Sequence, residues 1–139
     1  MVKRMWHYAS LLIALVLLLA ACEGGFSATG SSERSRITVN SGWIEKSFKK
    51  ANGSATQKIE LDWPGRRVEA TVTLEVGEGT FHIELLDGEG NVTLSLEATP
   101  GRPASGSGFM KADSFGDARY RVTAVEAKDV KYRIEFEIQ

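Results

Sequence analysis

An all-β fold is predicted from the sequence, a single antiparallel β-sandwich of about eight short strands. From residue 37 onward, apolar and polar side chains alternate with a period of two, which is typical of strands with one buried and one solvated face. Turn residues separate the alternating runs, and no window outside the N-terminal leader has helical periodicity. Because each strand has one apolar face, a second sheet must cover the first. Immunoglobulin-like and jelly-roll topologies both fit this pattern, and a small closed barrel is the alternative.

A signal peptide is predicted at residues 1–21. Lys3 and Arg4 give a positively charged start, and an unbroken apolar run follows at 11–21. A positive start, a short apolar stretch and small residues at its end are typical of secretory signal peptides. The alternative is a transmembrane helix, which needs about 20 apolar residues and therefore fits this shorter run less well.

The leader ends in the motif Leu19-Ala20-Ala21-Cys22. This motif resembles the lipobox of bacterial lipoproteins, in which an aliphatic residue and two small residues precede a cysteine. The resemblance covers only the first 22 residues. It implies that Cys22 carries a diacylglyceryl group and that the leader is cut immediately before it. An ordinary signal peptide with a chance cysteine is the alternative.

Acylation of Cys22 would fix the location of the protein. Two or three acyl chains on one residue anchor a protein stably, so the resemblance implies a membrane-anchored lipoprotein that faces the periplasm or the exterior. Asp after the cysteine resembles an inner-membrane retention signal in this family, whereas this chain has Glu23. The outer membrane is therefore favoured where the organism has one. Cys22 is the only cysteine, so no intrachain disulfide is expected.

A flexible tether is predicted at residues 22–36, followed by the folded domain at 37–139. The segment after Cys22 is rich in Gly and Ser, and Phe26 is its only large apolar residue. Such a segment cannot bury enough apolar surface to offset the entropy lost on ordering.

The strands of the folded domain are predicted from alternation alone. The run at 68–76 is the clearest, with Val68 and Val72 on one face and Glu69 and Thr71 on the other. In chain order, strands are predicted at 37–39, 43–48, 57–63, 68–76, 81–86, 92–98, 119–124 and 132–138, with a short edge strand from Phe109.

Three connections between these strands are predicted from their residues. Residues 87–91 contain Asp87-Gly88 between alternating runs, which is a strong hairpin signal. The stretch at 99–108 is rich in Gly, Pro and Ser and is expected to be a loop. The link at 127–130 is short enough for the last two runs to pair as a hairpin.

That last hairpin would place Arg119 and Arg121 opposite Glu135 and Glu137. Exposed ion pairs of this kind contribute to register more than to stability.

Trp43 is the candidate ligand-binding residue. Most aromatic residues share the parity of aliphatic neighbours and are expected in the core, namely Trp63, Phe81, Tyr120, Tyr132 and Phe136. Trp43 has the opposite parity to Ile44 and Phe48, which predicts that it lies on the outer face. An exposed Trp can stack on a sugar ring or anchor a protein contact. The alternative is that Trp43 is covered or belongs to the core.

The remaining residue types give little support for catalysis, metal binding or nucleic-acid binding. With 17 basic and 18 acidic side chains, the chain has no basic excess for a nucleic acid. Beyond the leader, His82 is the only histidine and shares a strand face with Glu84, whereas zinc sites use three or four ligands. No Gly-x-Ser-x-Gly motif occurs. We therefore expect no catalytic residues, no metal and no cofactor.

The sequence thus predicts a lipid-anchored envelope protein that displays a non-catalytic β-sandwich. The expected role is a binding or structural module for a macromolecular partner, either an envelope protein or a glycan. A carbohydrate- or peptidoglycan-binding module is the first alternative. The second is a small envelope hydrolase, which would need a concave site with paired carboxylates or His82.

Overall fold

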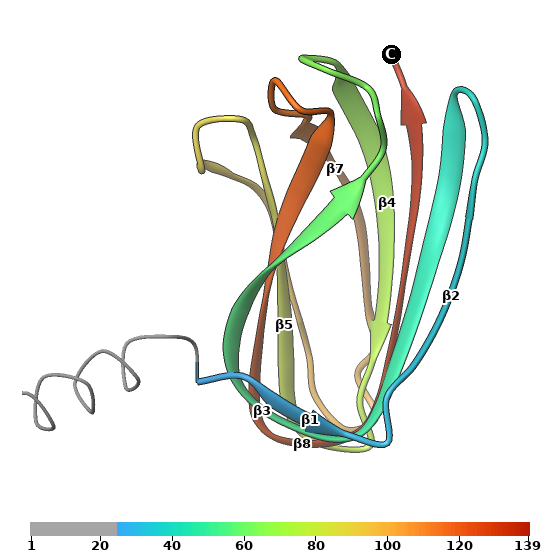
Figure 1. The fold of residues 1–139 in the computed structure, drawn as a ribbon. Coiled ribbons are helices and arrows are strands. Elements are labelled where there is room, and N and C mark those ends of the chain that lie inside the picture. Colours follow the sequence, from blue (N-terminus) through green and yellow to red (C-terminus); the bar gives the residue numbers. More distant parts are fainter. Residues whose placement is uncertain (1–24) are drawn as a thin grey trace, which may run out of the picture.

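The structure, a computed structural model, describes residues 25–139 and confirms the predicted all-β fold. No helix in this part of the chain is long and apolar enough to cross a membrane. The leader and Cys22, on which the signal-peptide and lipobox predictions rest, lie outside the described residues. The strands are β1 (Ser27–Thr29), β2 (Ser32–Ile37), β3 (Ser41–Glu60), β4 (Arg67–Glu75), β5 (Glu78–Leu86), β6 (Val92–Ala98), β7 (Ala104–Lys111) and β8 (Asp117–Ile138) (Figure 1).

Two long strands, β3 and β8, run through both layers of the sandwich. They have 20 and 22 residues and pair with each other in antiparallel register along their length. The first half of β3 and the second half of β8 lie between β2 and β4, and β7 completes this five-stranded layer in the order β2-β3-β8-β4-β7. The other halves continue with β5 and β6 as a four-stranded layer in the order β3-β8-β5-β6.

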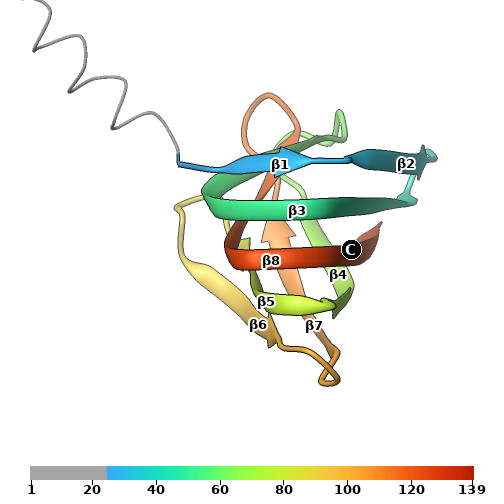
Figure 2. The same cartoon turned by 90° about the horizontal axis from the view of Figure 1, so that it is seen from below.

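The long strands bend at one end of the molecule, where they pass from one layer to the other (Figure 1). The pairing of β3 with β8 shifts register between Ala51 and Gly53, and Gly53 has a φ of 98°. In β8, Glu126 and Asp129 have φ values of 45° and 53°, a left-handed conformation that non-glycine residues adopt rarely. Figure 2, viewed toward this end, shows β1 and β2 along the edge of β3.

The core lies between the two layers and is built from the apolar faces of the strands. Phe81 stacks on Tyr132 with ring centroids 5.8 Å apart, and Tyr120 meets Tyr132 edge to face at 5.9 Å. The two tyrosine hydroxyls form a hydrogen bond of 2.8 Å, which satisfies both polar groups. Burial raises the pKa of both phenols well above the usual value, so the pair stays neutral.

The predicted hairpin at residues 87–91 is confirmed. It joins β5 to β6, and Asp87 accepts backbone hydrogen bonds from Glu89 and Asn91 at 2.9 and 2.8 Å. These contacts fix the turn because an Asp side chain can satisfy backbone donors that a tight turn leaves free. They also lower the pKa of Asp87, with the bond from Asn91 as the main cause.

The prediction of separate strands at 43–48 and 57–63 is wrong, because β3 is continuous through Glu60. Buried positions are even-numbered in the first part of β3, as at Ile44, and odd-numbered from Ala51 onward, as at Ile59. The buried parity therefore changes between Phe48 and Ala51, where β3 bends, so the sequence pattern breaks where the strand does not.

The predicted hairpin at 127–130 is wrong for a similar reason. The left-handed residues Glu126 and Asp129 shift the burial pattern within β8 without ending the strand. Arg121 therefore does not face Glu135 or Glu137. It donates instead to Glu84 of β5 at 2.9 Å.

The predicted flexible tether is wrong over β1 and β2, which both pair with β3. All six residues of β2 are exposed, so it carries no apolar signal of a strand. Backbone pairing holds it in place, together with ion pairs such as Arg34 with Glu45 at 3.1 Å. The folded part therefore begins before residue 37.

The predicted loop at 99–108 is wrong over its second half, where β7 begins at Ala104 and pairs with β4. Glycine in β7 lets β6 of the other layer approach closely. A Cβ on Gly108 would lie 2.7 Å from the Cβ of Leu94, and one on Gly106 would lie 3.2 Å from a methyl group of the same leucine. The residues that resemble a loop are therefore required by packing between the layers.

Candidate functional site

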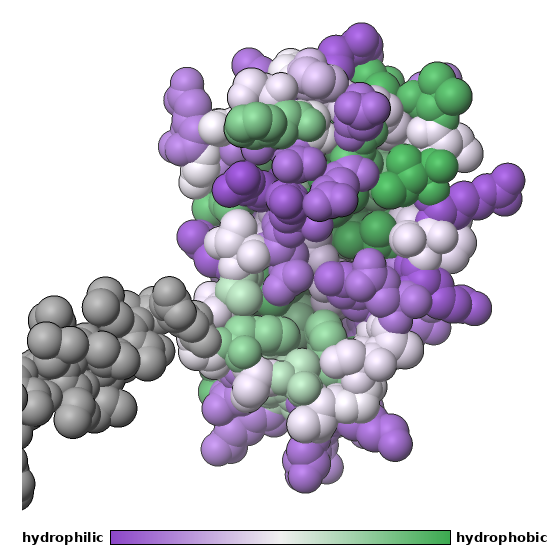
Figure 3. Space-filling view, in the orientation of Figure 1, coloured by the Kyte–Doolittle hydropathy of each residue, from purple (hydrophilic) through white to green (hydrophobic). Residues whose placement is uncertain are grey.

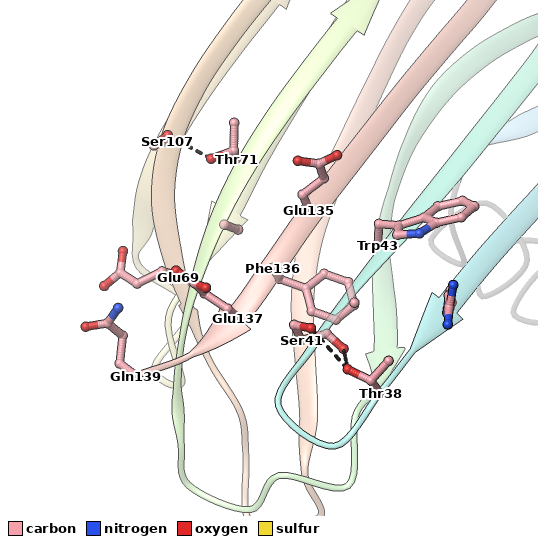
Figure 4. Close-up of a pocket in the computed structure, with 13 residues that line it drawn as sticks. Thr38, Ser41, Trp43, Glu69, Thr71, Ser107, Glu135, Phe136, Glu137 and Gln139 are labelled. Carbon is pink, nitrogen blue, oxygen red and sulfur yellow. Dashed lines mark hydrogen bonds between the residues drawn. The ribbon is translucent and has the colours of Figure 1, made fainter.

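An open groove of about 800 Å³ lies on the outer face of the five-stranded layer (Figure 4). Trp43 is the aromatic side chain on its exposed face, and the remaining lining is mostly polar. Hydroxyl groups come from Thr38, Ser41, Thr71 and Ser107, and carboxylates come from Glu69, Glu135 and Glu137. The groove therefore combines one large ring with many hydrogen-bonding groups.

Strand register aligns the central groove residues in one row. Trp43 of β3 pairs with Glu135 of β8, Glu135 pairs with Thr71 of β4, and Thr71 pairs with Ser107 of β7. Directly paired residues point to the same face of a sheet, so these four side chains lie side by side across four strands. The hydroxyls of Thr71 and Ser107 are 3.0 Å apart and form a hydrogen bond (Figure 4).

Trp43 lies on the outer face, as the alternation predicted, while its neighbour Ile44 is buried. The indole is half-buried, and the guanidinium of Arg133 lies 4.3 Å from its ring centroid. Arg133 is itself held by Glu135, to which its Nε donates at 2.9 Å. A cation over an aromatic face is attractive, so this contact helps to fix the orientation of the indole.

At one end of the same face, Glu45 lies beside three positively charged side chains. Its carboxylate lies 3.1 Å from Arg34, 3.6 Å from Arg133 and 3.9 Å from Lys131. Partial desolvation acts to raise the pKa of Glu45, but the hydrogen bond from Arg34 and the three positive charges outweigh it and lower the pKa. The Glu45 carboxylate therefore stays ionised at neutral pH among these three cations.

Two of the three groove carboxylates have arginine partners. Arg67 donates to Glu69 at 2.8 Å, and Arg133 donates to Glu135 at 2.9 Å. Glu137 is the direct cross-strand neighbour of Glu69. Carboxylate oxygens accept hydrogen bonds, so the groove can bind a ligand that carries many hydroxyl donors.

Apolar side chains border the groove at the β2–β3 turn. Ile37 and Val39 are 44% and 89% exposed there, on either side of the groove residue Thr38. In Figure 3 hydrophilic side chains cover the middle of the molecule, and hydrophobic ones gather on the side where Figure 1 places β2 and β3.

The second candidate feature, His82 with Glu84, lies on β5 in the other layer. His82 Nε2 is 2.6 Å from the hydroxyl of Ser95, and Glu84 accepts a hydrogen bond from Arg121. That bond from Arg121 is the main cause of the lowered pKa of Glu84. Residues 25–139 contain no group of three His, Cys, Asp or Glu side chains that could hold a metal ion.

Sequence reasoning found Trp43 but missed the rest of the groove. The groove needs residues of β2 and β7, where the sequence pattern predicts a tether and a loop. One sequence feature could have indicated it, because Arg-x-Glu occurs at 67–69 and at 133–135. In both cases the two charged residues share a strand face and form an ion pair.

No protein-family model matches this chain, and no curated protein matches it. Among solved structures, it is similar to an oxalate oxidase in complex with glycolate, with a TM-score of 0.45, 11% identity and coverage of 81% of this chain and 53% of that one. The chain thus spans about half the length of that oxidase.

Two further similar structures come from bacteria. A carbohydrate-binding module from Cellvibrio mixtus lichenase 5A, in complex with cellotriose, has a TM-score of 0.38 and 9% identity over 80% of this chain and 88% of that one. A Bacillus endospore appendage protein has a TM-score of 0.42 and 17% identity over 85% of this chain and 96% of that one. These likenesses are too distant to transfer a function.

Proposed function

We propose that this protein is a lipid-anchored, non-catalytic binding module of the bacterial cell envelope and that it binds a glycan in the groove around Trp43. One observation carries the proposal, the row of an indole, a carboxylate and two hydroxyls across an open sheet face. A sugar ring has an apolar C–H face that can stack on an indole and a rim of hydroxyls that can bond to carboxylates and side-chain hydroxyls.

The polar lining favours a glycan over a protein as the ligand. Protein interfaces have an apolar centre from which charged residues are depleted. Here Glu69, Glu135 and Glu137 lie in the groove beside four hydroxyl side chains. An envelope protein bound at the same face is the competing outcome.

The ion pairs of the groove support binding over catalysis. Glycoside hydrolysis uses two carboxyl groups on either side of the scissile bond. Glu69 and Glu135 are each engaged by an arginine, and both lie on an open face with access to water. Release of reducing sugars from a bound glycan by the purified protein would replace this proposal with the hydrolase alternative.

The lipobox supports the anchored part of the proposal. The motif at 19–22 ends at Cys22, and β1 begins at Ser27. Only four residues separate the predicted acylation site from the first strand, at 23–26, so the sandwich would stand close to the membrane.

Trp43→Ala should weaken glycan binding by about 30-fold, the effect of losing roughly 2 kcal/mol at a binding hot spot. Affinity electrophoresis against peptidoglycan fragments, xylan and β-glucans would measure the change. The thermal unfolding midpoint should change little because the indole lies on the outer face. Phe115→Ala is the matched control, since Phe115 is an 81% exposed aromatic in the β7–β8 loop outside the groove. Equal binding by the Trp43 variant and the wild type would contradict the proposal.

Cys22→Ala should move the protein from the membrane fraction to the soluble fraction, because it removes the thiol that would be acylated. Fractionation of cells followed by immunoblotting would measure this shift. Ser27→Ala, which leaves the lipobox intact, should remain in the membrane fraction. Retention of the Cys22 variant in the membrane with an uncut leader would indicate a membrane span instead.

A further inference from the structure

The outer face of the five-stranded layer carries the same three-residue arrangement twice. In the groove, Arg133 bonds to Glu135 and lies over Trp43, the residue paired with Glu135. At the far edge of the face, Arg67 bonds to Glu69 and lies 3.9 Å from the ring centroid of Phe109, the residue paired with Glu69.

Each arrangement holds a flat guanidinium against an aromatic ring at a fixed place on the sheet. The arginine is fixed by the carboxylate two residues further along its own strand and by the ring on the next strand. A guanidinium has five N–H donors, and the bond to Glu69 uses one of those on Arg67. The remaining donors, the ring and the carboxylate form a platform for a hydroxylated ligand.

The two platforms belong to one continuous strip. Glu69 and Ser107 both line the groove. Glu69 is the cross-strand partner of Phe109, and Ser107 is its next neighbour on the same face of β7. Trp43 lies on β3 and Phe109 on β7, three strand spacings apart. At about 4.8 Å per spacing, the two rings lie roughly 15 Å apart across the sheet, which is more than one sugar ring can cover.

The charges of the strip limit the class of ligand. Glu69 and Glu135 offset Arg67 and Arg133. Glu137, which lies between the two platforms, is balanced by Arg36, a groove residue paired with Trp43. The carboxylates and the arginines of the strip therefore balance, and the strip has no net charge that would attract a chain with a charge on every sugar. A neutral chain of linked sugars fits this balance.

We infer that the ligand is a linear, neutral glycan of several linked sugars, bound across the strands from Trp43 to Phe109. This inference rests on the proposed function and assigns the second platform, Phe109 with Arg67 and Glu69, as an additional subsite. Affinity therefore rises with chain length until the glycan reaches both rings. A short glycan uses the platform at Trp43 alone.

Calorimetric titration of the full domain with N-acetylglucosamine oligomers and with cello-oligosaccharides, from monosaccharide to hexasaccharide, tests the inference. We expect affinity to rise with length in at least one series. Phe109→Ala should weaken binding of the hexasaccharide about tenfold and leave binding of the disaccharide unchanged. Trp43→Ala should weaken binding of both, and Phe115→Ala should weaken binding of neither. Phe109→Leu, which keeps apolar volume but removes the ring, serves as a second variant should the alanine variant unfold.

The outcomes separate the inference from the proposed function. Affinity that depends on Trp43 but not on chain length or Phe109 overturns the inference and leaves the glycan-binding proposal standing. Absence of binding to every oligomer of both series overturns both. Tighter binding of a polyanionic oligosaccharide, such as an oligogalacturonate, overturns the assignment to neutral glycans.

Discussion

Replacing Phe81 by alanine is expected to lower the free energy of unfolding by about 3–5 kcal/mol. Phe81 is completely buried, stacks on Tyr132 and lies 6.2 Å from the ring of Phe48. Removal of its ring leaves a cavity between the two layers, and the strands around it cannot close that space fully. Urea denaturation followed by tryptophan fluorescence would measure the loss.

The matched control is Phe115→Ala, which removes the same ring from an 81% exposed position. We expect it to change the unfolding free energy by less than about 0.5 kcal/mol. Similar losses for both variants would show that Phe81 is not part of the core and would contradict the arrangement of the layers.

Replacing Gly79 by alanine is the second change with a large expected effect. It should lower the free energy of unfolding by about 3 kcal/mol or more. Gly79 lies in β5 with a φ of 71°, at the register shift in the antiparallel pairing of β5 with β8. A Cβ there would collide with the backbone carbonyl oxygens of Val125 and Glu126. Because backbone atoms cannot rotate away as a side chain can, β5 or β8 would have to shift.

Gly101→Ala is the control for Gly79→Ala, because it introduces the strain of a positive φ without a collision. Gly101 has a nearly identical φ of 74°, but a Cβ there meets no atom within 4 Å. Its variant should lose only the roughly 1–2 kcal/mol that a left-handed conformation costs a residue with a Cβ. Thermal unfolding of the two variants side by side would measure the difference. Equal losses would mean that β5 and β8 do not approach each other as described.

The sequence predicts the sandwich well where a strand keeps one face toward the core. In β4, Val68, Val72 and Leu74 are all buried, as their alternation predicts. The prediction fails in β3 and β8 because the buried parity changes where these strands bend, as between Ile44 and Ala51 of β3, although both strands continue. Alternation records the face of each residue but does not show whether a break in the pattern ends the strand.

The candidate site was only partly predictable for a different reason. The outer position of Trp43 follows from its own neighbours, so a local pattern was enough to find it. Its companions Glu135, Thr71 and Ser107 come from three other strands, and only the strand order brings them into one row. Strand order depends on long-range pairing, which alternation within each strand does not encode.

The central position of β8 determines when the domain can assemble. It pairs with β3, β4 and β5, and it comes last in the chain among the eight strands. Ser41 pairs with Glu137, so the contacts that close the sheet join distant parts of the chain, which makes folding slow. Until β8 emerges, three strands expose unpaired edges that other chains can bind. A protein of this design therefore depends on remaining unfolded, or protected by a chaperone, until β8 has been synthesised.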